Sequence, residues 1–133
     1  KVATVLTPST HGSTFGGNPL AMAVANAVLD VLLADGFLAE VERIADRLWG
    51  ALAALQSRHK RLIQEVRGKG LLIGLKLAPA AAVGDFVAAA REEGLLLVPA
   101  GDNVARVLPP LILGEAEVEA GVALLDQTCR AFA

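Results

Sequence analysis

The segment 62–77 narrows the choice of fold more than any other part of this sequence. Two apolar runs, 62–67 and 71–77, are rich in residues that favour β-strands, and they flank the sequence Gly68-Lys69-Gly70. Two such runs joined by a short glycine-containing connection predict an antiparallel β-hairpin. Gly74 interrupts the second run, which predicts a bulge or a close backbone approach. The fold must therefore contain a sheet with antiparallel pairing.

Helical and extended patterns surround this hairpin. Apolar residues recur about once per turn in two successive stretches, and Gly36 supplies a left-handed stop for the first of them. The predicted helices are 19–36, 37–58, 85–93 and 115–132, and the other predicted strands are a buried one at 95–98 and a last one at 104–108. The order ααββαββα predicts an α+β domain. We expect a small, mostly antiparallel sheet of three to four strands, covered by helices on one face.

The composition excludes several classes of protein. With 133 residues, 54% of them hydrophobic and 20% charged, the chain fits one folded domain with an apolar surface for a partner. A net charge of −2 without a block of Lys and Arg argues against nucleic-acid binding. No apolar run reaches about 18 residues, so we expect no membrane span. The single Cys129 fits a reducing cytoplasm, and we expect it to be an apolar filler.

The segment 11–19, His-Gly-Ser-Thr-Phe-Gly-Gly-Asn-Pro, combines two hydroxyls and three glycines directly before a helix. Glycine allows the backbone to approach a ligand closely, and Asn18 and Pro19 suit the start of a helix. Ser13, Thr14 and the free amides of the helix N-terminus would therefore receive a phosphate well. The alternative is that the glycines only shape a turn.

Arg106 is the second candidate for binding an anion. It lies on the apolar face of its predicted strand, just before Pro109 and Pro110, and a guanidinium there needs an anionic partner. That partner is either a bound ligand or a carboxylate of the chain itself. Arg67 and Lys69 beside the hairpin turn could also hold an anion, or could simply be solvated. No metal site is predicted, because the histidines and the cysteine lack ligand spacing.

Three segments, in this order and spacing, resemble the C-terminal part of the class III, ornithine-type aminotransferases, which use pyridoxal 5′-phosphate. They are His11-Gly-Ser-Thr-Phe-Gly-Gly-Asn-Pro-Leu-Ala21, Val66-Arg-Gly-Lys-Gly-Leu-Leu-Ile-Gly74 and Arg106-Val-Leu-Pro-Pro-Leu111. The resemblance extends over the whole chain but over only about the last third of such an enzyme. It implies that 19–133 is the C-terminal small domain of a fold-type I enzyme, and that 1–18 is a lead-in loop from a large domain that the chain lacks.

The resemblance also implies the roles of three residues. Ser13 and Thr14 would reach across a dimer interface to the cofactor phosphate, which the other subunit mainly holds. Arg106 would bind the α-carboxylate of the amino-acid or 2-oxo-acid substrate, and its bidentate guanidinium suits a planar carboxylate. The implied reaction passes an amino group between N-acetylornithine and 2-oxoglutarate, a step of arginine biosynthesis, in a cytoplasmic homodimer.

The chain departs from the family in what it lacks. The Schiff-base lysine, the acidic partner of the pyridine nitrogen and the aromatic that stacks on the ring lie in segments outside this sequence, so we expect no catalytic residue here and no activity from the chain alone. Ala105 and Gly114 are smaller than is usual in the family. Two alternatives remain: an independent α+β module that binds a small anionic metabolite, and an oligomerisation domain without catalysis.

Overall fold

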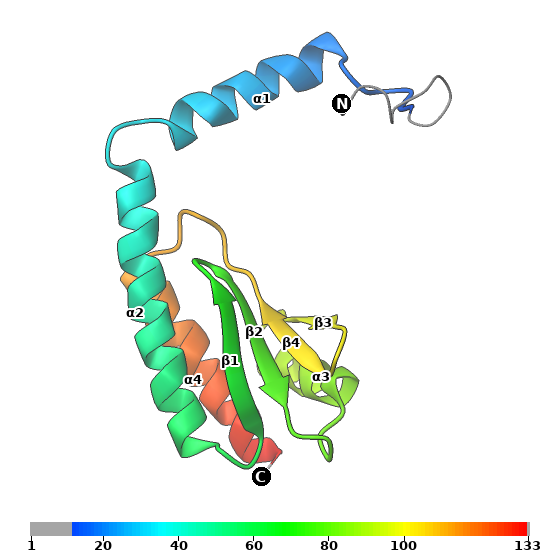
Figure 1. Ribbon diagram of the computed structural model, residues 1–133, viewed down its shortest axis with the longest axis vertical. Coiled ribbons are helices and arrows are strands. Elements are labelled where there is room, and N and C mark those ends of the chain that lie inside the picture. Colours follow the sequence, from blue (N-terminus) through cyan, green and yellow to red (C-terminus); the bar gives the residue numbers. More distant parts are fainter. Residues whose placement is uncertain (1–11, 133) are drawn as a thin grey trace, which may run out of the picture. The chain divides into compact units, whose positions relative to one another are not determined.

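The computed structural model describes residues 12–132, and the predictions for 1–11 lie outside the described residues. The chain divides into two compact units, 1–38 and 39–133, which we describe separately. The elements, labelled in Figure 1, are α1 Pro19–Leu32, α2 Phe37–Arg58, β1 Ile63–Lys69, β2 Leu72–Leu77, α3 Val83–Glu92, β3 Val98–Ala100, β4 Val104–Val107 and α4 Glu115–Ala131. This order, ααββαββα, is the one predicted, and the domain is α+β.

The second unit is built on a four-stranded antiparallel sheet with the strand order β1-β2-β4-β3. β1 and β2 form the predicted hairpin, but the turn lies two residues later than expected because β1 continues to Lys69. Gly68 explains the difference. It pairs with Ile73 at a φ of 141°, and a Cβ there would lie 2.1 Å from the Leu72 carbonyl oxygen. Glycine therefore lets the strand continue at this point.

The two faces of the sheet have different environments. Along β2, Ile73, Leu75 and Leu77 are buried, whereas the alternate residues face the other side. α2 and α4 lie side by side against the buried face, as Figure 1 shows. Ion pairs join these helices, among them Arg43–Glu115 and Arg47–Glu119 near the start of α4, each with an N–O distance of 2.6 Å. Helices of the second unit cover one face, as predicted.

The prediction of a buried strand over 95–98 was wrong. β3 begins only at Val98, and Leu96 is 81% exposed while Leu97 is buried. After α3, Gly94 turns the chain at a φ of 89°, and the Leu95 amide donates to the Ala90 carbonyl at 2.8 Å. The segment is therefore a connection between helix and strand. Its apolar run resembles a buried strand in composition alone.

The first helix also ends earlier than predicted. α1 stops at Leu32, while Gly36 takes a left-handed φ of 82° in the turn that follows. None of the side chains of α1 is buried within the described part of the chain. No single helix there is long and apolar enough to cross a membrane, and α1 and α2 meet that test only when taken together.

Candidate functional site

The loop before α1 carries the predicted phosphate-binding hydroxyls. Ser13 and Thr14 are both exposed, and neither hydroxyl has a hydrogen-bond partner among residues 12–132. The Gly16 amide donates to the Ser13 carbonyl at 3.3 Å and closes a turn, and Gly17 follows at a φ of 72°. Within residues 12–132, nothing therefore competes with a ligand oxygen for these two hydroxyls.

Asn18 caps α1 and so reduces the number of free amides at its start. The Asn18 Oδ1 accepts from the Ala21 amide at 2.9 Å, and its Nδ2 donates to the Phe15 carbonyl at 2.6 Å. Pro19 has no N–H, so within the described residues only the Leu20 amide of the first turn lacks a partner. Two hydroxyls and one amide are thus without a partner among residues 12–132, and they are the donors that this loop could offer a phosphate. The rest of its oxygens would need other donors.

Arg106 lies in β4 on the face of the sheet opposite α2 and α4. It pairs in register with Gly74 of β2 and with Val98 of β3. Its Nε is buried without a hydrogen-bond partner, and no carboxylate of residues 12–132 lies within ion-pair distance. The described chain therefore does not support the internal salt bridge. An unpaired buried donor costs about 1–3 kcal/mol, so an anionic ligand at Arg106 would be stabilising.

A groove of about 190 Å³ runs beside Arg106. Gly74 lines it, and the prediction of a bulge or a close backbone approach there was wrong: the pairing is regular at Gly74, and a Cβ added there would meet the side chain of Val104, with Cγ1 at 2.8 Å. Arg67, which pairs with Gly74 from the other side, forms the opposite wall. None of the residues that line the groove is acidic. A lining with two arginines and no acidic residue suits an anionic group such as a carboxylate.

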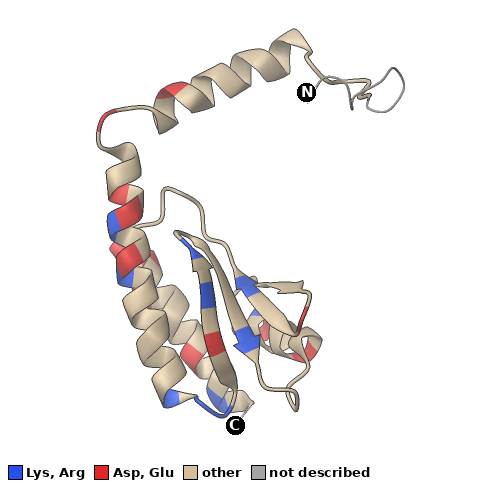
Figure 2. Cartoon of the chain, viewed as in Figure 1, with Lys and Arg blue, Asp and Glu red and all other residues tan. Residues whose placement is uncertain are grey.

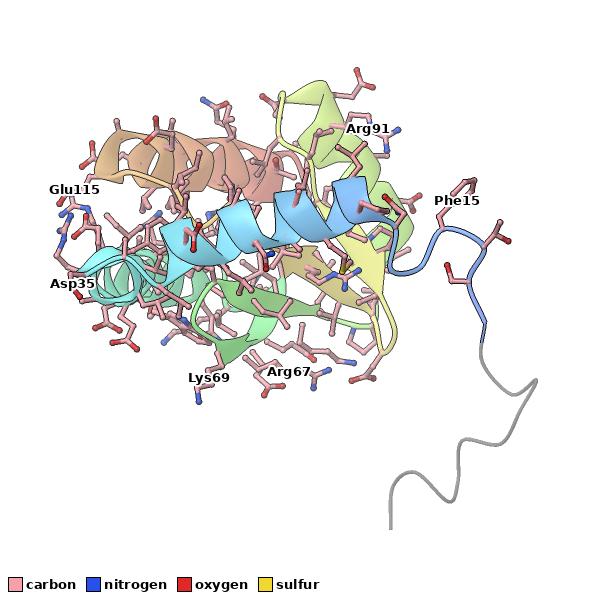
Figure 3. All side chains as sticks on the ribbon, turned by 90° about the horizontal axis from the view of Figure 1, so that it is seen from above. Phe15, Asp35, Arg67, Lys69, Arg91 and Glu115 are labelled. Atoms are coloured by element: carbon pink, nitrogen blue, oxygen red, sulfur yellow. The ribbon has the colours of Figure 1, made fainter. Side chains whose placement is uncertain are left out.

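The two guanidinium groups differ in how far the chain neutralises them. Asp102 accepts a hydrogen bond from Arg67 at 3.2 Å and another from Lys76, and these cations, Lys76 foremost, hold the pKa of the Asp102 carboxyl below its ordinary value. Figure 3 shows Arg67 and Lys69 projecting from the sheet on the side away from α4. The charge of Arg67 is thus largely compensated, whereas Arg106 has a donor to spare.

Sequence reasoning missed the residue that fixes the start of β4. Asn103 takes a φ of 54°, and its side chain joins the β3–β4 turn to the chain after β2 and to α3. Its Nδ2 donates to the Ala78 and Ala81 carbonyls at 3.1 and 2.9 Å, and its Oδ1 accepts from the Val83 amide at 2.9 Å. The Gly101-Asp102-Asn103 sequence indicated the turn, because Asp and Asn tolerate a left-handed backbone.

The described residues form neither a candidate metal site nor a candidate reactive thiol. No group of three His, Cys, Asp or Glu side chains among them could hold a metal ion. Cys129 is fully buried, and burial raises the pKa of its thiol to about 11, so it is an apolar filler as predicted. The phosphate loop lies in the first unit and Arg106 in the second.

Comparison with known proteins places this geometry in context. The acetylornithine aminotransferase 1 of Bradyrhizobium diazoefficiens is 54% identical over 125 residues, which are 94% of this chain and 30% of that protein. The crystal structure of acetylornithine aminotransferase from Elizabethkingia anophelis has a TM-score of 0.80 at 34% identity, over 98% of this chain and 33% of that one. This chain therefore spans about a third of the length of these relatives.

A third relative carries information on the cofactor. The ornithine aminotransferase of Toxoplasma gondii has a TM-score of 0.80 and 35% identity, over 98% of this chain and 31% of that one, and its structure shows partial occupancy of PLP at the active site. The sequence of this chain matches the family Aminotransferase class-III over residues 1–129. The chain therefore belongs to the class III aminotransferases.

Proposed function

We propose that this chain is the C-terminal part of a PLP-dependent aminotransferase of the acetylornithine type. In the complete protein, Arg106 binds the α-carboxylate of the amino-acid or 2-oxo-acid substrate. The observation that carries the proposal is the buried Arg106 Nε, which lacks a partner in the described chain and lies beside a groove with no acidic lining. A bound carboxylate would supply the missing acceptor.

Arg106 contributes to the reaction by orienting the substrate. Two parallel N–H···O bonds hold a planar carboxylate in one plane, and this fixes the direction of the substrate's Cα–H bond for proton removal. Gly74 contributes no side chain to the lining of the groove, and the space beside it is taken by Val104 Cγ1. PLP, when bound, withdraws electrons from the substrate's α-carbon.

Ser13 and Thr14 would hold part of the cofactor phosphate. Among residues 12–132 their hydroxyls and the Leu20 amide have no partner, and these three donors are too few for all the oxygens of a phosphate, which supports a phosphate shared with another part of the protein. We infer that a second subunit of a homodimer provides the other donors. The first helix, whose side chains are unburied in the described chain, is compatible with such a contact.

The chain alone should not transaminate, because the lysine, acid and ring-stacking aromatic of the family lie outside it. The test compares the complete protein with the 133-residue chain after borohydride reduction in the presence of PLP. The complete protein is expected to gain one pyridoxyl group and the chain none. Stoichiometric labelling of the chain, or glutamate production by it from acetylornithine and 2-oxoglutarate, would contradict this proposal.

The role of Arg106 is tested in the complete protein with Arg106→Gln. Loss of charge-assisted hydrogen bonds worth about 1.5–3 kcal/mol lowers kcat/KM for acetylornithine by about 10- to 150-fold. Arg106→Lys retains the charge and should fall between the parent and Gln. Arg91→Gln, which removes an exposed cation from the last turn of α3, is the matched control. If Arg106→Gln stays within threefold of the parent, Arg106 does not bind the carboxylate.

A further inference from the structure

A second pocket lies at the opposite end of α2 from the Arg43–Glu115 ion pair. It has a volume of about 560 Å³, within the range of small-molecule sites, and it opens where α2 ends and the chain turns into β1. The residues that line it are Ser57, Arg58, His59, Lys60, Arg61, Leu62, Ala78, Ala80, Ala81 and Phe132. The groove beside Arg106 shares none of these residues.

The lining of this basic pocket combines positive charge with an apolar wall. Four consecutive residues, 58–61, are basic, and none of the lining residues is acidic. Figure 2 shows basic residues at the ends of α2 and α4 and along the loop into β1, as well as elsewhere on α2 and on the sheet. Phe132 is held in place by an edge-on contact with Phe86, with ring centroids 5.5 Å apart. A ligand here would carry an anionic group on an apolar body.

Internal pairing accounts for only part of this charge. Asp126 is the acceptor for Arg58 at 3.2 Å and for His59 at 2.8 Å, and it also pairs with Arg130. Arg58 and Arg130 lie in the last turns of their helices, where cations favour the helix dipole. One carboxylate therefore serves three basic side chains and has no free capacity for others.

Lys60 and Arg61 remain without compensation. Neither side chain has an ion pair or a hydrogen bond to any residue of 12–132, and both lie beyond the end of α2, where the helix dipole does not explain them. The two adjacent positive charges of Lys60 and Arg61 exceed the single negative charge of a carboxylate. A phosphate monoester, with a charge of about −1.5 to −2 at neutral pH, matches them better.

We propose that this basic pocket binds an organic phosphate monoester, with Lys60 and Arg61 holding the phosphate and Phe132 and the alanines contacting the organic body. The proposal is independent of the aminotransferase reaction. It concerns other residues, and it can hold or fail whatever the outcome at Arg106.

Phenyl phosphate is the probe, titrated into the complete, PLP-loaded protein and followed by calorimetry. Saturable binding is expected, about tenfold or more tighter than binding of inorganic phosphate or of phenol. Lys60→Gln/Arg61→Gln should weaken it by a further factor of about ten or more. Lys69→Gln/Arg91→Gln removes the same charge from exposed positions elsewhere and should bind as the parent does.

Three results would overturn the proposal. The first is an equal affinity of the parent and of Lys60→Gln/Arg61→Gln for phenyl phosphate. The second is an equal affinity of the parent for phenyl phosphate and for inorganic phosphate. The third is binding that does not saturate at millimolar phenyl phosphate. Both substituted side chains are exposed, so the variant is expected to fold, and its circular dichroism spectrum checks this. Arg106→Gln is included as a further arm, since unchanged binding there separates this pocket from the substrate groove.

Discussion

Asp126 should be the carboxylate on which the stability of the second unit depends most strongly. Its side chain is only 13% exposed, and it accepts from His59, Arg58 and Arg130 at the junction of α2 and α4. These hydrogen bonds, that of His59 foremost, lower the pKa of the Asp126 carboxyl from 3.8 to about 2. Asp126→Asn removes the charge and retains the size of the side chain.

The loss of stability expected for Asp126→Asn follows from the lowered pKa of the Asp126 carboxyl. A decrease from 3.8 to about 2 corresponds to roughly 2.4 kcal/mol at neutral pH, at about 1.4 kcal/mol for each tenfold change in proton affinity. Arg58 and Arg130 are 51% and 73% exposed, so solvent screening reduces the expected value to about 1–2 kcal/mol. Because the folded pKa is the lower one, the contribution is complete above pH 4. It falls to roughly half at pH 3 and is largely lost at pH 2.

The measurement is urea unfolding of the chain between pH 2.5 and 7, for the parent and for Asp126→Asn. Trp49 is its single tryptophan, packs against the core and donates from Nε1 to the Gly70 carbonyl at 2.8 Å, so its fluorescence reports this unit. Asp46→Asn, at an exposed position of α2, is the control and should change the free energy of unfolding by less than about 0.5 kcal/mol. A difference between parent and Asp126→Asn that stays constant across the pH range would refute the reasoning.

Two glycines give predictions of opposite sign. Gly68→Ala should destabilise the chain by about 2 kcal/mol or more, because its φ of 141° is unfavourable for alanine and the new Cβ would lie 2.1 Å from the Leu72 carbonyl oxygen; unchanged urea midpoints would contradict this. Gly114→Ser should stabilise it by about 0.3–1 kcal/mol, because Gly114 is the N-cap of α4 at a φ of −106°, which serine adopts readily. The only close neighbour of the new Cβ is the flexible end of Glu117, at 2.7 Å, and a lower midpoint would show that this carboxylate cannot move.

Local sequence patterns predicted the elements that depend mainly on residues close together in the chain. The hairpin and the helices α2 and α4 follow from strand-favouring runs, helical spacing and glycine turns, and the structure has them with small shifts. β3 failed because the run 95–98 has the composition of a buried strand, while its place is decided by the end of α3 and by pairing with β4. Nothing within the run encodes that pairing.

The basic pocket, too, could not be predicted from local sequence patterns. The run 58–61 is visible in the sequence, but a short charge run is most often a solvated surface. What makes it a pocket is the arrival of Phe132 from the end of α4 and of Ala78 to Ala81 from the β2–α3 connection. Such contacts join residues that are far apart in the chain, so no pattern in the neighbourhood of 58–61 predicts them.

Arg106 and Gly74 were singled out by two separate arguments, and the register of the sheet joins them. The alternation of β4 placed the arginine on one face, and the glycine within β2 marked a position without a side chain, although the predicted bulge or close backbone approach is absent. Antiparallel pairing sets Gly74 directly opposite Arg106, with Val104 Cγ1 in the space that a side chain at position 74 would fill. A slip of one residue would turn Gly74 to the helix-covered face and put a larger side chain beside the guanidinium. The groove therefore depends on the same pairing that buries Ile73 and Leu75, so the packing of the core and the access to Arg106 cannot vary independently.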